Sequence, residues 1–409
     1  MKKFIWIACL IYCLNGFGHI IIGTILEPMV ASYGIQYGDG GQLIMNQFLG
    51  FLVGVLVAPF LVNGLGRRMT LLIALLSFAV SQFIFGSLPN WNLLLFVAPF
   101  AGAGIGIGET VVAALIVAHL KEKKASTLIL VEVFFGVGAL LIPVISAFLI
   151  SRNIWNLSFS FVACVTTITL LIWFFSSFGE MDSVLKKQPK KVDENGKKPE
   201  KLRYTRKQIP IVTIGAVFFF MYVGAEMVLP NYLPTILHKT TQLDASSLAL
   251  SITVFWLAMT IGRMLMTFIV DRIGYTKLFV VSCIGQFLGL FVFALSPSIW
   301  ISYGAIFFTG LLMGGIFSIG LLIINDTSQG HEERTTSLLV ALGGLGGAIL
   351  PKIVGELIDR FAISVTLWTM VGFAFILVSL MGVIFYLKNK SEVREDKKQV
   401  SSKMNRSLL

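Results

Sequence analysis

Hydrophobic residues in this chain lie in long unbroken runs rather than in the one-sided stripes of helices that cover a soluble core. A run of about 18 or more residues with few charges is typical of a membrane-spanning helix. Twelve runs fit this description, and their predicted bounds are 4–32, 42–64, 69–88, 93–119, 126–150, 155–179, 209–237, 245–270, 276–296, 298–324, 334–358 and 362–388. The pattern therefore predicts an all-α membrane protein with twelve transmembrane helices.

The most conspicuous polar interruption of this pattern covers residues 180–207. It is rich in lysine and is punctuated by Pro189 and Gly196, a composition typical of a linker. We therefore expect four parts in the chain: an N-terminal six-helix half at 1–179, a basic linker at 180–207, a C-terminal six-helix half at 208–388 and a tail at 389–409.

Lysine and arginine are distributed unevenly between the two ends of the predicted helices. Of the 32 in the chain, 27 lie on the side that carries both termini and the linker, and Arg263 and Lys352 lie within spans. The other side has three: Arg152, Lys239 and Arg360. Cytoplasmic loops carry such an excess, so both termini and the linker are predicted to be cytoplasmic. Basic loops facing anionic membrane lipids then explain the net charge of +11, and no nucleic-acid partner is needed.

Composition and motifs narrow the function classes further. Hydrophobic residues make up 56% of the chain and charged residues 13%, which excludes an ordinary cytosolic enzyme and a disordered chain. The four cysteines lie in apolar runs without metal-ligand spacing, so we expect no metal and no other cofactor. The sequence contains no G-x-x-x-x-G-K-S/T motif, so any transport across the membrane would have to draw on a gradient rather than on ATP.

The two predicted halves are alike at one loop. The loop between the second and third runs reads PFLVNGLGRR, and the loop between the eighth and ninth reads TFIVDRIGYTK. Their glycines Gly66 and Gly274 are 208 residues apart, about half of the chain. In transporters built from repeated six-helix units, the substrate binds near mid-membrane between the repeats. The repeat therefore indicates a transport function.

This loop is similar to the motif G-x-x-x-D-x-x-G-R-K/R of the major facilitator superfamily. The second copy keeps Asp271, Arg272 and Gly274, whereas the first has Asn63 at the acidic position and Pro59 at the leading glycine. Six further segments resemble the fucose/glucose permease family, and in particular its bacterial glucose/mannose:proton symporters. These segments are 46–54, 106–110, 132–139, 222–226, 261–263 and 343–347, in order along nearly the whole chain.

The resemblance implies a multi-pass protein of a bacterial-type cell membrane, expected as a monomer, that takes up a neutral hexose together with a proton. The glucose/mannose symporters carry a glutamate at the positions of Glu132 and Glu226, whereas fucose permease has glutamine at that of Glu132. Fucose permease also has a helix-1 aspartate, where this chain reads His19-Ile-Ile-Ile-Gly23-Thr24. The missing acid argues against fucose as substrate and against a relay of two carboxylates.

Three ionisable side chains are predicted at a similar depth in the membrane, where charges are costly and by default mark function. At a rise of 1.5 Å per residue, Glu109 lies about 5 Å, and Glu132 and Arg263 about 9 Å, to the cytoplasmic side of mid-helix. We expect a proton-coupling cluster that bridges the halves, with Arg263 paired to one acid and Glu109 as the favoured proton carrier. A fixed pair that only holds helices together is the alternative. Lys352 is expected to pair with Glu356, four residues further along its helix.

Substrate-binding candidates are polar or aromatic side chains near mid-membrane. His19 lies almost at the middle of its helix, whereas Glu226 lies to the outer side of mid-helix. Imidazole and amide groups can bond sugar hydroxyls as donors and acceptors, and an indole can stack on the apolar face of a sugar. The predicted substrate-binding set is His19, Asn46, Gln47, Glu226, Asn231 and Trp256.

Two other functions fit the sequence. An exporter of drugs or lipids with the same fold would use an aromatic cavity with one acid, and the 34 phenylalanines are compatible with that function. A membrane-bound sensor or scaffold would use the basic linker to bind acidic lipids or a protein. Uptake of labelled sugar, compared with efflux of a dye, separates the importer from the exporter.

Overall fold

A computed structural model describes residues 2–119, 124–179, 182, 185, 204–205, 208–240, 244–296, 298–328 and 332–406. Most of the predicted linker lies outside the described residues. Before the linker the helices are α1 (Lys2–Thr24), α2 (Leu26–Tyr33), α3 (Tyr37–Leu65), α4 (Arg67–Gly86), α5 (Trp91–His119), α6 (Lys124–Ser151) and α7 (Leu157–Phe175). After it they are α9 (Gln208–Thr240), α10 (Ala245–Ile273), α11 (Tyr275–Leu295), α12 (Ile299–Met313), α13 (Ile316–Thr327), α14 (Glu332–Arg360) and α15 (Ile363–Arg406).

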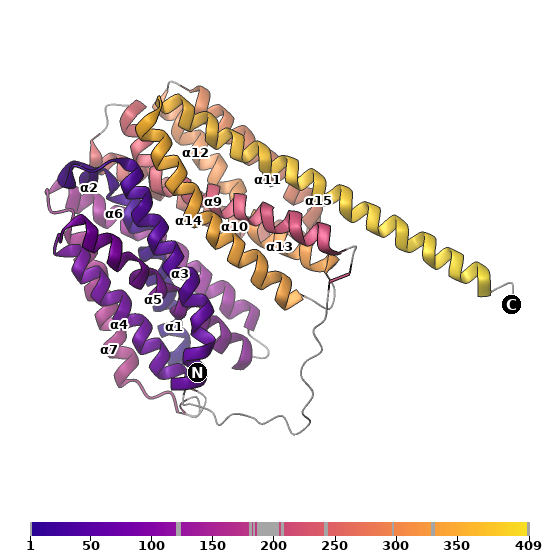
Figure 1. The fold of residues 1–409 in the computed structure, drawn as a ribbon, viewed down its shortest axis with the longest axis horizontal. Helices are drawn as coiled ribbons and strands as arrows, with labels where there is room; N and C mark the ends of the chain where they lie inside the picture. The colour runs from indigo at the N-terminus through magenta and orange to yellow at the C-terminus, as the bar shows by residue number, and fades with distance from the viewer. Residues whose placement is uncertain are drawn as a thin grey trace.

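The described residues contain 12 candidate membrane spans, which confirms the predicted all-α fold. Helices α1–α7 gather on one side of the molecule and α9–α15 on the other (Figure 1). Contacts between the two groups run along α3 and α14 and along α6 and α10. Because the described residues form an even number of spans, the first span begins and the last span ends on the same face of the membrane. We call this the terminal face, and the other the opposite face.

Two predicted spans are interrupted where the sequence weakens a helix. The span predicted at 4–32 divides into α1 and α2 at Ile25. Pro28 lacks the N–H that would bond the carbonyl of Thr24, so α1 ends at that residue. The span predicted at 298–324 divides into α12 and α13 at Gly314 and Gly315, in keeping with the low helix propensity of glycine.

The two loops that are alike in sequence are also alike in backbone conformation. Gly66 joins α3 to α4 with φ 83°, and Gly274 joins α10 to α11 with φ 84°. Residues with a Cβ rarely adopt this conformation, so each turn favours glycine. In the first loop, the guanidinium of Arg68 donates to the carbonyls of Phe174 and Ser176 at the end of α7, both at 2.8 Å. The basic residue of this loop therefore holds the terminal-face end of α7.

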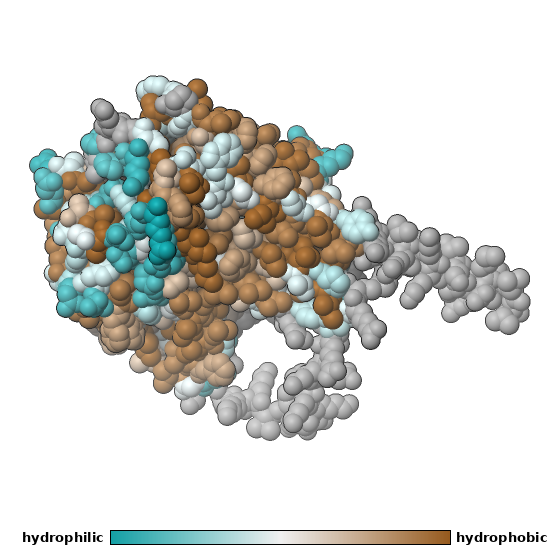
Figure 2. Space-filling model, turned by 45° about the horizontal axis from the view of Figure 1, so that its top comes forward, coloured by the Kyte–Doolittle hydropathy of each residue, from teal (hydrophilic) through white to brown (hydrophobic). Residues whose placement is uncertain are grey.

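The surface has the polarity expected of a protein surrounded by lipid. Apolar side chains cover the flanks of the bundle, and hydrophilic ones gather at one end in this view (Figure 2). Large apolar side chains point outward, among them Trp300, Phe175 and Phe60 with exposed fractions of 83%, 77% and 76%. Side chains of this kind would be unfavourable in water and are favourable in a hydrocarbon layer.

Packing is tighter toward the opposite face than toward the terminal face. In α9, every residue of 224–237 is buried. In α3, Leu49 is the one exposed residue of 37–50, whereas residues 51–65 include eight exposed residues. The halves therefore meet most closely near the opposite face, and the structure is the arrangement that is closed on that face.

Candidate functional site

Three phenylalanines surround His19 of α1. Its ring centroid lies 5.2 Å from that of Phe48 and 5.4 Å from that of Phe51, both on α3, and 5.6 Å from that of Phe135 on α6. Phe48 and Phe51 are three residues apart, so they project from the same side of their helix. The result is a half-buried imidazole in an aromatic cage within the N-terminal group of helices.

The aromatic contacts continue into the C-terminal group of helices. The ring of Phe135 lies 5.8 Å from that of Trp256 on α10, in an edge-to-face arrangement. The guanidinium carbon of Arg263, also on α10, lies 5.9 Å from the centroid of Trp256. A row of aromatic rings therefore connects His19 with Arg263 across the seam between the two groups of helices.

Arg263 forms an ion pair with Glu226 of α9, with 3.5 Å between its Nη2 and the Oε1 of the glutamate. The side chain of Glu226 is 7% exposed and that of Arg263 is 33% exposed. The sequence places Glu226 to the outer side of mid-helix and Arg263 to the cytoplasmic side, and it did not predict this ion pair. A depth counted along each helix takes no account of helix tilt, which averages about 20°, or of the long flexible stem that carries the charge of an arginine.

Glu132 of α6 and Glu109 of α5 lie close to this pair. Glu132 interacts electrostatically with Glu109 and with Arg263. The Tyr12 side chain of α1 lies within electrostatic range of both acids. The side chain of Glu132 is exposed and that of Glu109 is half-buried, in contrast to the buried Glu226. The structure thus brings the three predicted coupling residues together, and their part in proton transfer stays a prediction.

Two amides and one indole among the predicted substrate-binding residues have polar atoms that the described residues leave without a hydrogen bond. The Nδ2 of Asn231 donates to the carbonyl of Met227 at 2.7 Å, and the Nε2 of Gln47 donates to that of Gly18 at 2.8 Å. In the part of the chain that the structure describes, the Oδ1 of Asn231, the Oε1 of Gln47 and the Nε1 of Trp256 are buried without a hydrogen-bond partner. Leaving such atoms unpaired is unfavourable, so a ligand that bonds them gains affinity.

Asn46 is placed differently from the other candidates. Its Oδ1 accepts from the Nε2 of Gln42 at 2.8 Å, and its Nδ2 donates to the carbonyl of Leu95 at 3.0 Å. The first bond lies within α3, and the second fastens α3 to α5 within the N-terminal group. Substrate binding by Asn46 stays a prediction, and the contacts favour a structural part for it.

The sequence reasoning missed several residues of this centre: Tyr12, Phe48, Phe51, Phe135 and Tyr222. Tyr222 donates to the carbonyl of Met313 at 2.9 Å and lies within electrostatic range of Glu226 and Arg263. The 34 phenylalanines carry little positional information in so apolar a chain. The available signal was the spacing along one helix: Phe48 directly follows the polar pair 46–47, and Phe51 lies about one turn further on.

Twelve spans among the described residues lie in two groups, with aromatic and ionisable side chains at the seam between them, and this arrangement defines a secondary membrane transporter. The chain belongs to the Major Facilitator Superfamily, whose sequence profile matches residues 8–238 and 214–407. It is therefore a transporter and not an enzyme.

Known proteins with related sequences or folds agree with this assignment. The chain is 27% identical over 385 residues to the glucose/mannose transporter GlcP of Bacillus subtilis, covering 94% of this chain and 95% of GlcP. It is 22% identical over 417 residues to the sodium-dependent glucose transporter 1A of Mus musculus, covering 94% and 96%. A crystal structure of a D-xylose-proton symporter superposes with a TM-score of 0.76 at 14% identity, covering 93% and 97%, which shows the shared fold.

Proposed function

We propose that the protein takes up a neutral hexose together with a proton by alternating access. The observation that carries this proposal is the set of buried, unpartnered polar atoms of Gln47, Asn231 and Trp256 among the described residues. Amide oxygens and an indole N–H are groups that can bond sugar hydroxyls. This chemistry and the 27% identity to GlcP support a hexose as the cargo.

A hexose suits this centre for two physical reasons. Its hydroxyls both donate and accept, so they can bond the two amide oxygens and the indole N–H. Its C–H face is apolar and packs on aromatic rings such as Phe135 and Trp256, which lie 5.8 Å apart. The cation at the site, Arg263, is paired with Glu226, so the centre favours a neutral cargo over an anionic one.

Coupling to a proton is assigned to Glu109. Arg263 pairs with the buried Glu226, and an adjacent cation favours the ionised form of that acid. Glu109 has the carboxylate of Glu132 as an electrostatic neighbour. An acid in that setting can hold a proton in one conformation and release it in another. Sodium is the alternative coupling ion.

We place the terminal face in the cytoplasm and the protein in the cell membrane. The excess of Lys and Arg on the terminal face supports this orientation, and the bacterial relative supports the location. With this orientation, the structure corresponds to a state that is closed toward the outside.

The test is exchange of labelled sugar by the purified protein in proteoliposomes. Vesicles preloaded with D-glucose, D-mannose, L-fucose or D-xylose receive a trace of labelled glucose outside, and we expect glucose and mannose to drive its entry. Trp256→Phe keeps the ring packing but removes the N–H, so the affinity for glucose should fall about 5- to 10-fold. Trp300→Phe, at an exposed site, is the matched control and should leave affinity unchanged.

The aromatic cage around His19 would also accept an apolar cargo, as an exporter requires. Efflux of a fluorescent dye from the same proteoliposomes measures this second function. Dye efflux without exchange of any sugar in the panel would overturn the proposal in favour of export.

A further inference from the structure

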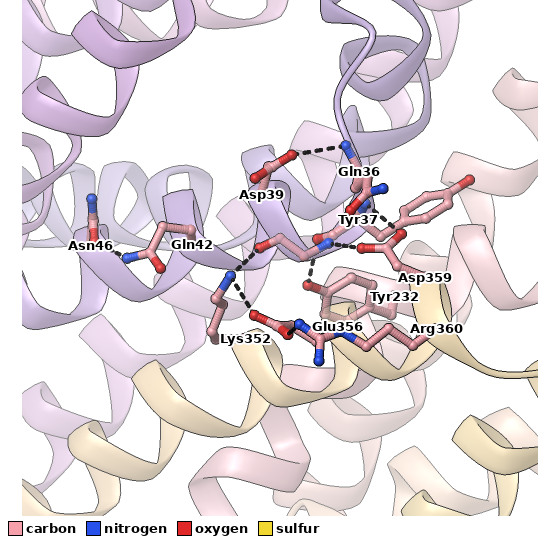
Figure 3. A network of polar contacts seen from close by, with 11 residues as sticks. Gln36, Tyr37, Asp39, Gln42, Asn46, Tyr232, Lys352, Glu356, Asp359 and Arg360 are labelled. Carbon is pink, nitrogen blue, oxygen red and sulfur yellow. Dashed lines mark hydrogen bonds and ion pairs between the residues drawn. The ribbon is translucent and has the colours of Figure 1, made fainter.

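Polar groups from both halves meet at the opposite face, where α3 begins and α14 ends. Figure 3 shows Asp359 of α14 directed at the start of α3 beside Tyr37. One carboxylate oxygen accepts from the backbone N–H of Tyr37 at 2.9 Å, and the other accepts from that of Gly38. Asp359 and Gly38 are 321 positions apart in the chain. A side chain of the C-terminal half therefore caps a helix of the N-terminal half.

The capped groups have no other natural partner in a helix. The first N–H groups of any helix lack an acceptor within that helix. In α3, the N–H of Gln36 bonds the carboxylate of Asp39 at 3.0 Å, and the N–H of Asp39 bonds the carbonyl of Gln36 at 3.1 Å. Asp359 supplies the acceptors for the two N–H groups that remain between them.

The charge of Asp359 is stabilised by the first turn of α3 only while the two halves are in contact on this face. The start of a helix carries a partial positive charge and its end a partial negative charge. Asp359 lies in the last turn of α14, where its own helix disfavours a carboxylate. Docked on the first turn of α3, the same carboxylate meets the positive end of another helix. Separation of the two helices on this face would remove that compensation and expose the amides to water.

The surrounding contacts hold the same two residues from the other side. The Nζ of Lys352 donates to the carbonyl of Gly38 at 2.9 Å and pairs with Glu356 at 3.0 Å. The hydroxyl of Tyr232 donates to the carbonyl of Tyr37 at 3.4 Å. The backbone N–H and C=O of Tyr37, and those of Gly38, are therefore all bonded by side chains of the C-terminal half.

Glycine allows the close approach on which these bonds depend. A Cβ at Gly355 of α14 would lie 2.6 Å from the carbonyl oxygen of Tyr37 and 2.4 Å from the hydroxyl of Tyr232. A Cβ at Gly41 of α3 would lie 2.9 Å from the Cα of Lys352. Real Cβ atoms do not approach backbone so closely, so a methyl group at Gly355 would push α14 and α3 apart.

We propose that Asp359 is the gating residue of the opposite face: its carboxylate, docked on the amides of Tyr37 and Gly38, stabilises the state closed on that face and undocks when the face opens. The proposal rests on transport by alternating access and not on the identity of the cargo. Its test therefore measures conformation and needs no substrate.

The experiment measures distances between spin-label pairs by pulsed electron resonance, in a background whose four native cysteines are replaced by serine. One pair, at Asn90 and Ala362, reports on the opposite face. The other pair, at Gly64 and Ile273, reports on the terminal face. All four positions are exposed, and each pair has one label on either half.

Asp359→Asn removes the charge and one of the two carboxylate acceptors at nearly constant shape. We expect the population with a long Asn90–Ala362 distance to rise at least about tenfold relative to the short one, because hydrogen bonds to charged groups are among the strong ones. The distance of the terminal-face pair should shorten in parallel. Asp39→Asn is the matched control, since Asp39 bonds Gln36 at the start of its own helix rather than the other half. Its distance distributions should equal those of the protein with aspartate at position 39.

A second variant keeps the carboxylate and tests the same contact sterically. Gly355→Ala should shift the distances in the same direction as Asp359→Asn, and alanine favours the helix, so this variant remains informative if Asp359→Asn does not fold. The proposal is overturned if the distance distributions of Gly355→Ala equal those of the control Asp39→Asn and, where Asp359→Asn folds, its distributions equal them too. A failure of sugar exchange with shifted distances would instead contradict the proposed cargo and leave the gate standing.

Discussion

Removal of Arg263 should destabilise the protein through the acid that it leaves behind. The Nη2 of Arg263 lies 3.5 Å from the Oε1 of Glu226, whose side chain is only 7% exposed. Taking away one partner of a buried ion pair costs about 3–5 kcal/mol, because the other charge remains without compensation. A third of the Arg263 side chain is exposed, so we expect the low end of that range. Arg263→Ala should therefore lower the free energy of unfolding by about 3 kcal/mol, roughly a 150-fold change in the folding equilibrium.

A second substitution added to Arg263→Ala identifies the acid whose uncompensated charge lowers the stability. Glu226→Gln keeps the shape of the side chain and removes its charge, so Arg263→Ala with Glu226→Gln should recover about 2 kcal/mol. The side chain of Glu132 is exposed whereas that of Glu226 is buried, so Arg263→Ala with Glu132→Gln should recover less. This expectation replaces the sequence-based one, in which Glu109 or Glu132 was the partner of Arg263.

The assay is unfolding of the purified protein in mild detergent by titration with a denaturing detergent, followed by circular dichroism. Arg272→Ala, at an exposed arginine near the end of the same helix, is the matched control and should change stability by less than about 0.5 kcal/mol. Rescue by Glu132→Gln or Glu109→Gln without rescue by Glu226→Gln would refute the pairing.

Three further predictions concern coupling, topology and pH. Glu109→Gln mimics a permanently protonated acid, so labelled sugar should still exchange across proteoliposomes but no longer accumulate against a gradient. A cysteine at Gly196 should resist membrane-impermeant thiol reagents in intact cells if the linker is cytoplasmic. The Ser177 hydroxyl, which donates to Asp182 at 2.9 Å, holds the pKa of that carboxyl below its usual range. Its stabilisation is present above the unfolded pKa of about 3.9 and is lost as pH falls through the folded value, so Ser177→Ala should lower the melting temperature above about pH 4 and not below it.

Each of these three has a result that contradicts it. Accumulation of sugar by Glu109→Gln would place the proton carrier elsewhere, with Glu132, His19 and Glu226 next to test. Ready labelling at Gly196 would reverse the orientation. A melting-temperature difference between Ser177→Ala and the native protein that persists unchanged below about pH 3 would show that the hydroxyl acts through something other than the charge of Asp182.

The membrane helices could be predicted from the sequence because long apolar runs leave the backbone few alternatives to a helix. Most predicted bounds fall within a few residues of the observed ones, and the pairing of Lys352 with Glu356 on one helix, at 3.0 Å, is confirmed. The breaks at Ile25 and at Gly314 were missed, although Pro28 and the glycine pair signal them.

Contacts between the halves could not be predicted in the same way. The depth of each residue along its helix predicts that Glu226 and Arg263 lie apart, because depth takes no account of helix tilt or of the length of the arginine side chain. Asp359 gave no signal, since an acid at the end of a span normally faces water. Its contact with Tyr37 arises from the way α3 and α14 meet at the opposite face, and residue spacing along one helix carries no information about that.

The measurement that tests the central claim most directly is accumulation of labelled glucose by the purified protein in proteoliposomes under an imposed pH gradient, alkaline inside. The account predicts that internal glucose rises above the external concentration without sodium, and that a protonophore abolishes the accumulation. Accumulation driven by a sodium gradient but not by a pH gradient, or no accumulation under either, would contradict it.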